Sequence, residues 1–466
     1  MPRVVQTILH ESTETQSGAP RLLHQLGLFD ATMLVMGGIV GAGIFINPYV
    51  VARQVHTPVL ILAVWMAGGI VAMLGAFIYA ELAARMPHVG GQYAYLREAF
   101  HPAVGFLYGW VLLLVIQTGG MAAVTVTFAR YLLELTHWPI SERVVAVAAI
   151  AALTIINCLG VKLGSRVQSV LMLLKIGAIA MLVLTGLFLV RKPQPLLHPV
   201  LDRPASFDLA TALVAAMVPV LFAFGGWQTA NFVASEIKEP RKNLSRALIL
   251  GVAGVIALYF GVNLVCVRTL SAQGLAVTTV PATAVMRMTM GETGARLIAL
   301  GIAVSTLGFL SQSVLTAPRV YFAMARDGLF FRNVARVTAR THVPAVAILL
   351  QSIWTIVVAL SGSYEKILNY VVSIDFIFFG LTGATLFVFR RRDMQRDAQI
   401  ADELHRYRVP GHPFTTGLFV LACWLVVINT IHKYPENTLV GVLILLLGLP
   451  VYWLWARRKQ QQGEEA

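Results

Sequence analysis

Two glycine-containing segments are the parts of this chain best suited to binding a ligand. Gly41-Ala42-Gly43-Ile44-Phe45 interrupts an apolar run from about Phe29 to Ala52, and Phe224-Gly225-Gly226 interrupts a later apolar run. Each glycine costs a helix interior roughly 1 kcal/mol relative to alanine, so both segments weaken a helix. Backbone groups freed inside a membrane are tolerated only where they face protein, ligand or water. The two segments therefore predict a polar site within the apolar part of the protein.

A broken helix suits a zwitterionic ligand. The half-helix that starts near Ile44 presents unpaired N–H groups and the positive end of the helix dipole to a carboxylate. The carbonyls that end each first half, around Ile39 and Phe222, can accept hydrogen bonds from an ammonium group. The alternative reading of Gly-x-Gly is close packing between membrane helices. Two breaks that lie five spans apart favour the binding site, because such pairs mark the substrate site of inverted-repeat transporters.

Lys175 lies some nine residues, or about 13 Å, into another apolar run. A lysine stem snorkels only part of that distance, and a charge at such depth usually faces the bundle interior. We therefore predict that Lys175 is a fixed cation in the place of a coupling sodium ion, bridging the first and eighth spans. The alternative is a lysine nearer the interface, with a misplaced helix boundary.

Other polar and aromatic residues in the apolar runs have two readings each. Asp375 is either a group that titrates with substrate or a proton, or a hydrogen-bonded structural acid. Ser305 and Thr306 either bond to their own helix or meet Lys175. Three aromatic residues beside the second interruption either pack in the core or occlude a ligand: Phe222, Phe224 and Trp227.

The composition is that of an integral membrane protein. Of 466 residues, 57% are hydrophobic and 12% are charged, whereas soluble domains carry roughly 25% charged residues. Apolar runs of about 18–27 residues allow roughly twelve helical spans. The expected spans are 29–53 and 208–236, both broken, and 59–84, 103–133, 143–161, 167–190, 245–270, 294–325, 343–361, 366–390, 414–432 and 437–456.

We therefore expect an all-α membrane protein of about 12 transmembrane helices with a 5+5 inverted repeat, discontinuous helices 1 and 6, and two appended helices. The expected parts are an N-terminal cytoplasmic segment (1–28), two repeats (29–190 and 208–390), the appended pair (414–456) and a cytoplasmic tail (457–466). Residues 87–95 predict a short interfacial helix on the cytoplasmic side. No signal-peptide pattern precedes the first span.

The net charge of +14 is explained by membrane orientation. With both termini inside, cytoplasmic segments hold roughly 24 of the 36 Lys and Arg residues. We expect a multi-pass protein of the plasma (inner) membrane and no nucleic-acid partner. Cys158, Cys266 and Cys423 fall within spans, which predicts buried thiols and no disulfide framework.

Two acidic residues near the cytoplasmic ends of spans predict ion pairs that hold the inner gate or the helix ends. These residues are Glu81 and Glu236. Arg85, Lys238 and Arg241 are the basic residues close to them in sequence.

Taken together, these stretches resemble the amino acid–polyamine–organocation superfamily and, within it, the L-type amino acid transporter family, over nearly the whole chain. The resemblance rests on the joint order and spacing of residues 41–48, 79–82, 87, 90–95, 222–227, 231–232, 236, 240, 243–244, 305–308 and 326–328. It implies an inverted-repeat fold that moves amino acids by alternating access, often by exchange.

The resemblance also implies roles for single residues. The carboxylate-binding segment corresponds to Gly41, Ala42 and Gly43, and the segment that receives the amino group corresponds to Phe222, Ala223 and Gly225, with Phe222 as a gating aromatic. Lys175 matches the fifth-span lysine associated with sodium independence, and Ser305 matches its eighth-span neighbour. The expected site is Ile39, Gly41, Ala42, Gly43, Ile44, Phe222, Ala223, Phe224 and Gly225 for substrate, and Lys175, Ser305, Thr306 and Asp375 for coupling or gating.

Three departures from the family pattern stand out. Ala42 occupies a position where many members have serine, and Phe224 one where many have tyrosine. The loop at 135–139 lacks the cysteine that animal members use to bond an accessory heavy chain. We therefore expect a bacterial-type single-chain protein without a disulfide-linked partner.

We expect a sodium-independent amino acid transporter, an exchanger of small to medium neutral L-amino acids, with no cofactor or metal. A proton-coupled amino acid permease is the alternative within this class. A ligand-sensing membrane receptor on a transporter scaffold is the alternative from another class. Enzymatic activity is not expected, because the spans show no metal-ligand cluster and no nucleophile–base pair.

Overall fold

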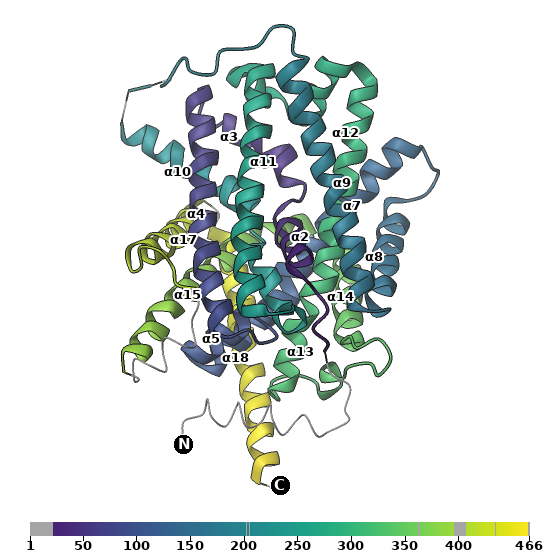
Figure 1. Cartoon of the computed structure of the whole chain (residues 1–466), viewed down its shortest axis with the longest axis vertical. Helices are drawn as coiled ribbons and strands as arrows, with labels where there is room; N and C mark the ends of the chain where they lie inside the picture. Colours follow the sequence, from purple (N-terminus) through teal and green to yellow (C-terminus); the bar gives the residue numbers. More distant parts are fainter. Residues whose placement is uncertain are drawn as a thin grey trace.

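The computed structural model of the chain is a bundle of long helices, most of which run along its long axis (Figure 1). It describes residues 22–464 except 202, 205, 362–363, 396–406 and 434. Among these residues, eight helices are long and apolar enough to cross a membrane, and a bent pair makes a ninth. A helix lies at every predicted span, so the all-α membrane fold is confirmed.

The first five spans follow the predicted order. The first span is α2 (Leu28–Ile39) and α3 (Gly43–Ala52), bent by 42°. The elements that follow are α4 (Pro58–Arg85), the short α5 (Gln92–Ala99), α6 (Pro102–Val111), the π-helical turn η1 (Leu112–Ile116), α7 (Gln117–Thr136), α8 (Glu142–Cys158) and α9 (Val161–Phe188). α5 begins five residues later than the short helix predicted at 87–95 and continues to Ala99, so only residues 92–95 of that prediction are helical.

The sixth span is also broken, into α10 (Phe207–Phe224) and the 3₁₀-helix η2 (Trp227–Glu236). The remaining elements are α11 (Pro240–Val277), α12 (Pro281–Thr316), α13 (Pro318–Arg326), η3 (Arg332–Ala335), α14 (Ala345–Ser361), α15 (Tyr364–Met394), α17 (Phe414–Lys433) and α18 (Pro435–Glu464). α18 ends at the bottom of the view, where α5 and α13 also lie (Figure 1).

The backbone at the two breaks explains why these helices stop. In the first break (residues 40–42), Val40 adopts an extended conformation with ψ of 100°, which ends α2. In the second break (residues 225–226), Gly225 is extended and Gly226 has φ of +111°. Residues with a side chain rarely adopt a backbone conformation with so positive a φ, so glycine is required at position 226.

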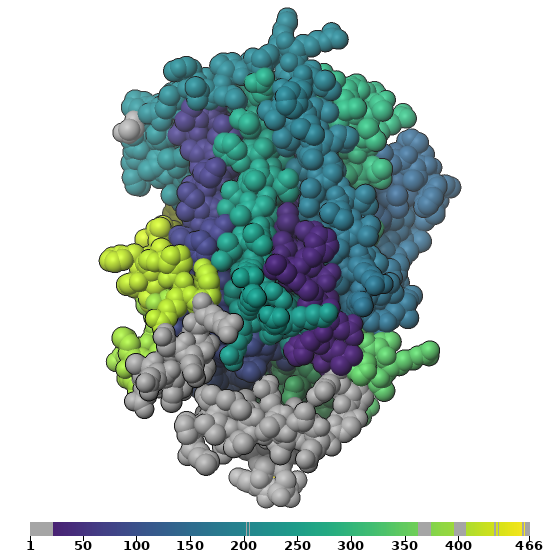
Figure 2. All heavy atoms as spheres, viewed as in Figure 1, coloured from purple at the N-terminus to yellow at the C-terminus, as the bar shows by residue number. Residues whose placement is uncertain are grey.

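The second break lies against the last turn of α2, just before the first break, with the two backbones in contact. A Cβ atom added to Gly38 would lie 2.6 Å from the carbonyl oxygen of Gly226. α2 packs against η2, α9 and α11, and its purple atoms reach the surface between α11 and α9 (Figure 2). Glycine at positions 38 and 226 therefore allows two interrupted helices to meet inside the bundle.

Candidate functional site

Lys175 binds the backbone of the first break. Its side chain is fully buried, and its Nζ donates to the carbonyl oxygen of Val40 at 2.5 Å. Its Cε lies where Gly308 of α12 leaves room, since a Cβ atom at Gly308 would be only 2.6 Å away. α9 begins at Val161 rather than at the predicted residue 167, so Lys175 is further from the helix start than expected. Among the described residues, no carboxylate forms an ion pair with it.

The adjacent hydroxyls of α12 do different things. Ser305 Oγ donates to the carbonyl oxygen of Gly41 at 3.2 Å. Thr306 Oγ1 instead donates to Ala303 in its own helix at 2.7 Å. Of the two residues, Ser305 alone contacts the first break, and Thr306 follows the local alternative.

The start of α3 presents free backbone donors. Within the described chain, the N–H groups of Gly41, Ala42 and Ile44 have no hydrogen-bond partner, as is usual for the first turn of a helix. Gly41, Ala42 and Gly43 are half-buried, while Ile44 is fully buried. These N–H groups, with the positive end of the α3 dipole, can bind a carboxylate.

Tyr259 of α11 joins the two breaks, and the sequence interpretation missed it. Its hydroxyl lies 3.1 Å from the carbonyl oxygen of Ile39 and 3.2 Å from that of Ala223. One hydroxyl hydrogen can serve only one of these carbonyls at a time. A lone tyrosine within a long apolar run was the available signal, but nothing in that run indicates which way it faces.

The aromatic residues near the second break face different surroundings. Phe222 is 41% exposed, so packing alone does not account for its ring. The ring of Phe224 is 1% exposed and packs against Trp65 and Tyr259. Trp227 stacks on Phe379 of α15 with ring centroids 5.1 Å apart. Packing therefore accounts for the rings of Phe224 and Trp227.

The remaining backbone groups of the second break are partly satisfied locally. The N–H of Gly225 donates to the carbonyl oxygen of Phe222 at 3.1 Å. Gly226 donates its N–H to Gln228 Oε1 and accepts from Thr229 Oγ1. Since a carbonyl oxygen has two lone pairs, those of Phe222 and Ala223 retain capacity for an ammonium group.

Asp375 lies on α15, one helical turn before Phe379. No hydrogen bond connects it to either break within the described residues. The structure therefore does not bring it together with Lys175 and Ser305.

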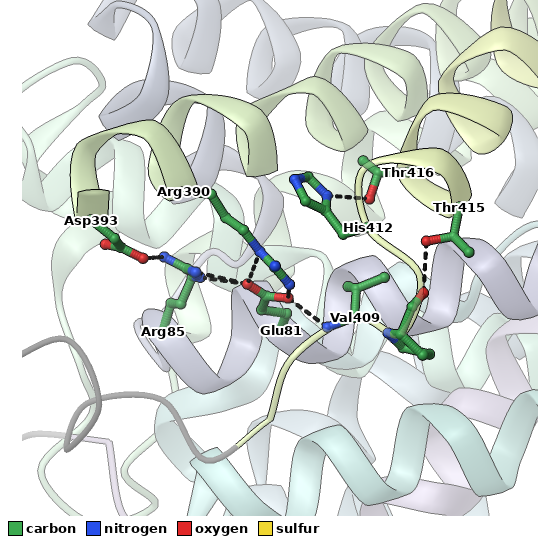
Figure 3. A network of polar contacts seen from close by, with 9 residues as sticks. Glu81, Arg85, Arg390, Asp393, Val409, His412, Thr415 and Thr416 are labelled. Carbon is green, nitrogen blue, oxygen red and sulfur yellow. Dashed lines mark hydrogen bonds and ion pairs between the residues drawn. The ribbon is translucent and has the colours of Figure 1, made fainter. Parts of the chain in front are cut away.

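Glu81 is the centre of an ion-pair network at the end of α4 (Figure 3). This buried carboxylate accepts from Arg85 of the same helix and from Arg390 of α15, each at 2.7 Å in an ion pair. It also accepts from the N–H of Val409, in the segment before α17, at 2.6 Å. Arg85 in turn contacts Asp393 at 2.6 Å. The network holds three parts of the chain together at one end of the bundle.

Glu236 has a partner that its sequence neighbours do not indicate. Its carboxylate pairs with Arg319 of α13 at 2.6 Å, and both side chains are fully buried. The predicted ion pair is therefore confirmed, and its partner is a residue 83 positions away that the fold brings against Glu236, not Lys238 or Arg241 nearby in sequence. This pair fastens the end of η2 to α13.

The three cysteines are free thiols. Cys266 and Cys423 are buried, as predicted, and Cys158 is half-buried.

Known proteins are similar to this one over almost the whole chain. A sequence profile described as "Amino acid permease" matches residues 26–453. The chain is similar to the serine/threonine exchanger SteT of Bacillus subtilis (strain 168), with 30% identity over 94% of this chain and 98% of the relative. It is also similar to the mouse large neutral amino acids transporter small subunit 2, with 29% identity over 94% of this chain and 82% of the relative. The human cystine/glutamate transporter is 27% identical over 93% of this chain and 86% of its own length.

Proposed function

We propose that this chain, which belongs to the amino acid permease family, is a sodium-independent exchanger of small to medium neutral L-amino acids. The observation that carries the proposal is the pair of breaks in contact, with Lys175 bonded to one and Tyr259 bridging both. Among the described residues, the side chains that bond to the breaks are neutral apart from Lys175. The ammonium group of Lys175 already donates to the carbonyl oxygen of Val40. This favours a ligand with a neutral side chain, and the serine/threonine exchange named for SteT supports the same class.

The substrate carboxylate would bind the free N–H groups of Gly41, Ala42 and Ile44. Its ammonium group would bind the carbonyl oxygens of Phe222 and Ala223. Binding at both breaks gives the substrate a different set of contacts in each state of the carrier, which alternating access requires. Of the remaining substrate residues proposed from the sequence, Ile39 and Gly43 contribute backbone, while Phe224 and Gly225 shape the second break.

Lys175 accounts for the proposed absence of sodium coupling. In related folds, carbonyls freed by unwound helices coordinate sodium. Here the Lys175 ammonium is bonded to such a carbonyl, at Val40, with Ser305 bonded to the next one. A fixed cation in this place removes the need for an ion from solution. We assign a direct coupling or gating role to Lys175 and Ser305, which bond to the first break. Thr306 and Asp375 would take part only indirectly, by movement of α12 and α15.

The arrangement in the membrane is part of the proposal. Residues 29–190 and 208–390 would be the two repeats, since each begins with a broken span. The termini would lie in the cytoplasm, because basic residues cluster at the ends of α15 and α18. The plasma membrane is the proposed location. No disulfide-linked heavy chain is proposed.

Counterflow in proteoliposomes tests the proposal. Vesicles loaded with unlabelled serine should accumulate labelled serine, alanine or leucine, and arginine should be a poor substrate. Replacing sodium by choline should leave the rate unchanged, and vesicles without internal amino acid should accumulate little. Uptake into empty vesicles driven by a pH gradient would instead indicate a proton-coupled permease. Saturable binding without any flux would indicate a receptor.

A further inference from the structure

Two glutamines lie two helical turns from the residues that bind the first break. Gln168 precedes Lys175 by seven residues on α9, and Gln312 follows Ser305 by seven residues on α12. Seven residues are close to two full turns, or about 10.5 Å, so each glutamine shares a helix face with its site residue. Both glutamines are buried, with exposed fractions of 0% and 1%.

The two glutamines lie on the same side of the substrate site. α9 and α12 are antiparallel, since Gly301 faces Ala178 and Gly164 faces Leu315. Gln168 lies toward the N-terminus of α9 and Gln312 toward the C-terminus of α12. In antiparallel helices these two directions are the same, and here both point toward α13 at the bottom of the view (Figure 1). This is the end of the bundle that the proposed function places in the cytoplasm.

The surface of α2 that meets these glutamines carries no side chain. A Cβ atom at Gly37 would collide with the amide nitrogen of Gln168 and would lie 3.8 Å from Cγ of Gln312. A Cβ atom at Gly38 would lie 3.3 Å from Nε2 of Gln312 and 2.8 Å from Oγ1 of Thr229. The amides thus press directly on the backbone of a half-helix that is broken at its other end.

The hydrogen bonding of the amides is incomplete. Gln312 Nε2 donates to Thr229 Oγ1 of η2 at 2.5 Å and to Thr316 Oγ1 at 3.2 Å. Its Oε1, and both polar atoms of Gln168, have no partner among the described residues. Orphaned buried polar groups are costly, and apolar side chains of equal size would fill the same space without that cost. Space filling therefore does not account for two amides here.

We propose that Gln168 and Gln312 line the cytoplasmic half of the substrate passage and that their unpartnered amides bias the carrier toward its inward-open state. The present structure is closed on this side, since both glutamines are buried, and their amides are incompletely bonded to the described residues. When α2 and η2 leave α12, water reaches the amides and supplies the missing hydrogen bonds. The proposal rests on the proposed function, because only a carrier needs such a passage.

Thiol accessibility tests the passage. Thr316→Cys is a nearly isosteric reporter, eleven residues after Ser305 on the same face of α12 and fully buried here. It is introduced into a chain whose three cysteines are replaced by alanine and whose counterflow is retained. A charged, impermeant methanethiosulfonate applied from the cytoplasmic side should modify the reporter during exchange. Leu173→Cys, on the lipid-facing side of α9 and 53% exposed, should stay unmodified.

A second substitution tests the bias. Gln168→Met keeps the side-chain length and removes both orphaned atoms, so it should favour the closed state. We expect the reporter to be modified about tenfold more slowly, equal to roughly 1.4 kcal/mol. Leu173→Met, on the same helix but facing lipid, should leave the rate unchanged. An unchanged rate in Gln168→Met would overturn the bias.

The outcomes separate the passage from the transport function. If Thr316→Cys does not fold, Gln312→Cys serves as the reporter. Intact counterflow with both reporters unmodified would overturn the passage. Modification without counterflow of any amino acid in the parent protein would overturn the proposed function while leaving the passage supported.

Discussion

Replacing Lys175 by methionine tests the role of the buried cation. The substitution keeps the length of the side chain and removes the ammonium group that donates to Val40 at 2.5 Å. A hydrogen bond from a charged group contributes roughly 1.5–3 kcal/mol. If that bond orders the first break for substrate, its loss should lower the exchange rate at low substrate concentration by roughly 10- to 150-fold.

Initial rates of serine counterflow measure the effect, with thermal unfolding as a control for folding. Methionine removes the cost of burying an ammonium group, which offsets the lost hydrogen bond to Val40, so we expect the variant to unfold at about the same temperature as the parent. Loss of exchange in a stable protein would place the effect in the site rather than in the fold.

Gly308→Ala perturbs the same ammonium without removing it. The added methyl group would lie 2.6 Å from Lys175 Cε and 3.1 Å from Nζ, so the side chain must move away from Val40. We expect the exchange rate to fall in the same direction as in Lys175→Met, and by less. Gly177→Ala on α9 is the matched control, because nothing lies within 4 Å of its added methyl group. Wild-type exchange in both Lys175→Met and Gly308→Ala would show that the buried ammonium does not order the first break for substrate.

Three further predictions concern other parts of the molecule. Tyr259→Phe should lower kcat/KM for exchange by roughly 5- to 150-fold, the equivalent of about 1–3 kcal/mol for a carbonyl left unpaired. Tyr108→Phe is the control and should leave kcat/KM unchanged, because it removes a buried hydroxyl that has no partner in the described chain. Arg319→Met leaves the carboxylate of Glu236 buried and unpaired, which should cost about 3–5 kcal/mol of stability in denaturation measurements; adding Glu236→Gln should recover most of the loss, and a single variant as stable as the parent would contradict the assignment. Burial lowers the pKa of His412, so the unfolded chain, with a pKa near 6.5, binds the proton more readily. Stability should therefore fall as the pH drops through about 6.5, and His412→Gln should flatten that part of the pH profile.

Local sequence was sufficient to locate the spans and both breaks. Membrane helices must satisfy their own backbone, so apolar-run length marks them, and paired glycines mark where they stop. The start of α9 was placed too late because Lys162 and Arg166 interrupt the apolar run, yet both residues are compatible with a helix. Charge near the end of a membrane helix reduces the apolar signal without ending the helix.

Contacts between distant helices could not be read in the same way. Tyr259 reaches both breaks, and Arg319 reaches Glu236, because α11 and α13 turn those side chains inward. α11 is apolar on all sides, so it carries no periodicity from which the facing of Tyr259 could be judged. α13 is short and polar, yet all its residues from Pro318 to Ala325 are buried, so the pattern alone would have placed Arg319 at the surface. Lys175 was predictable for a different reason: a charge at that depth must face the interior, whatever the other residues of its helix do.

The way α2 and η2 are joined bears on how exchange would proceed. The N–H groups of Gln25 and Leu26 donate to the backbone carbonyl oxygen of Glu236, at 2.8 and 2.9 Å. The N–H of Lys238 donates to the backbone carbonyl oxygen of Leu26 at 2.8 Å. Leu26 and Ile237 thereby form a parallel bridge at one end of the two half-helices, while the glycines at the breaks touch at the other. Because the two half-helices are joined at both ends, we expect them to move as one body.

Backbone contacts join α2 to η2, whereas side chains from other helices attach this body to its surroundings. Side chains from five helices hold it: Lys175 from α9, Tyr259 from α11, Ser305 and Gln312 from α12, Arg319 from α13 and Tyr95 from α5. Apart from the buried Arg319–Glu236 pair, each attachment is one or two hydrogen bonds, whose net contribution is about 0.5–3 kcal/mol. The body can therefore leave α9, α11 and α12 without unwinding a helix, provided that α13 moves with it. Because α2 and η2 each end at one of the breaks, their joint movement alters the carboxylate and amino contacts in the same step. A substrate bound at both breaks would then be released to one side as a whole, which is what obligatory exchange of intact amino acids requires.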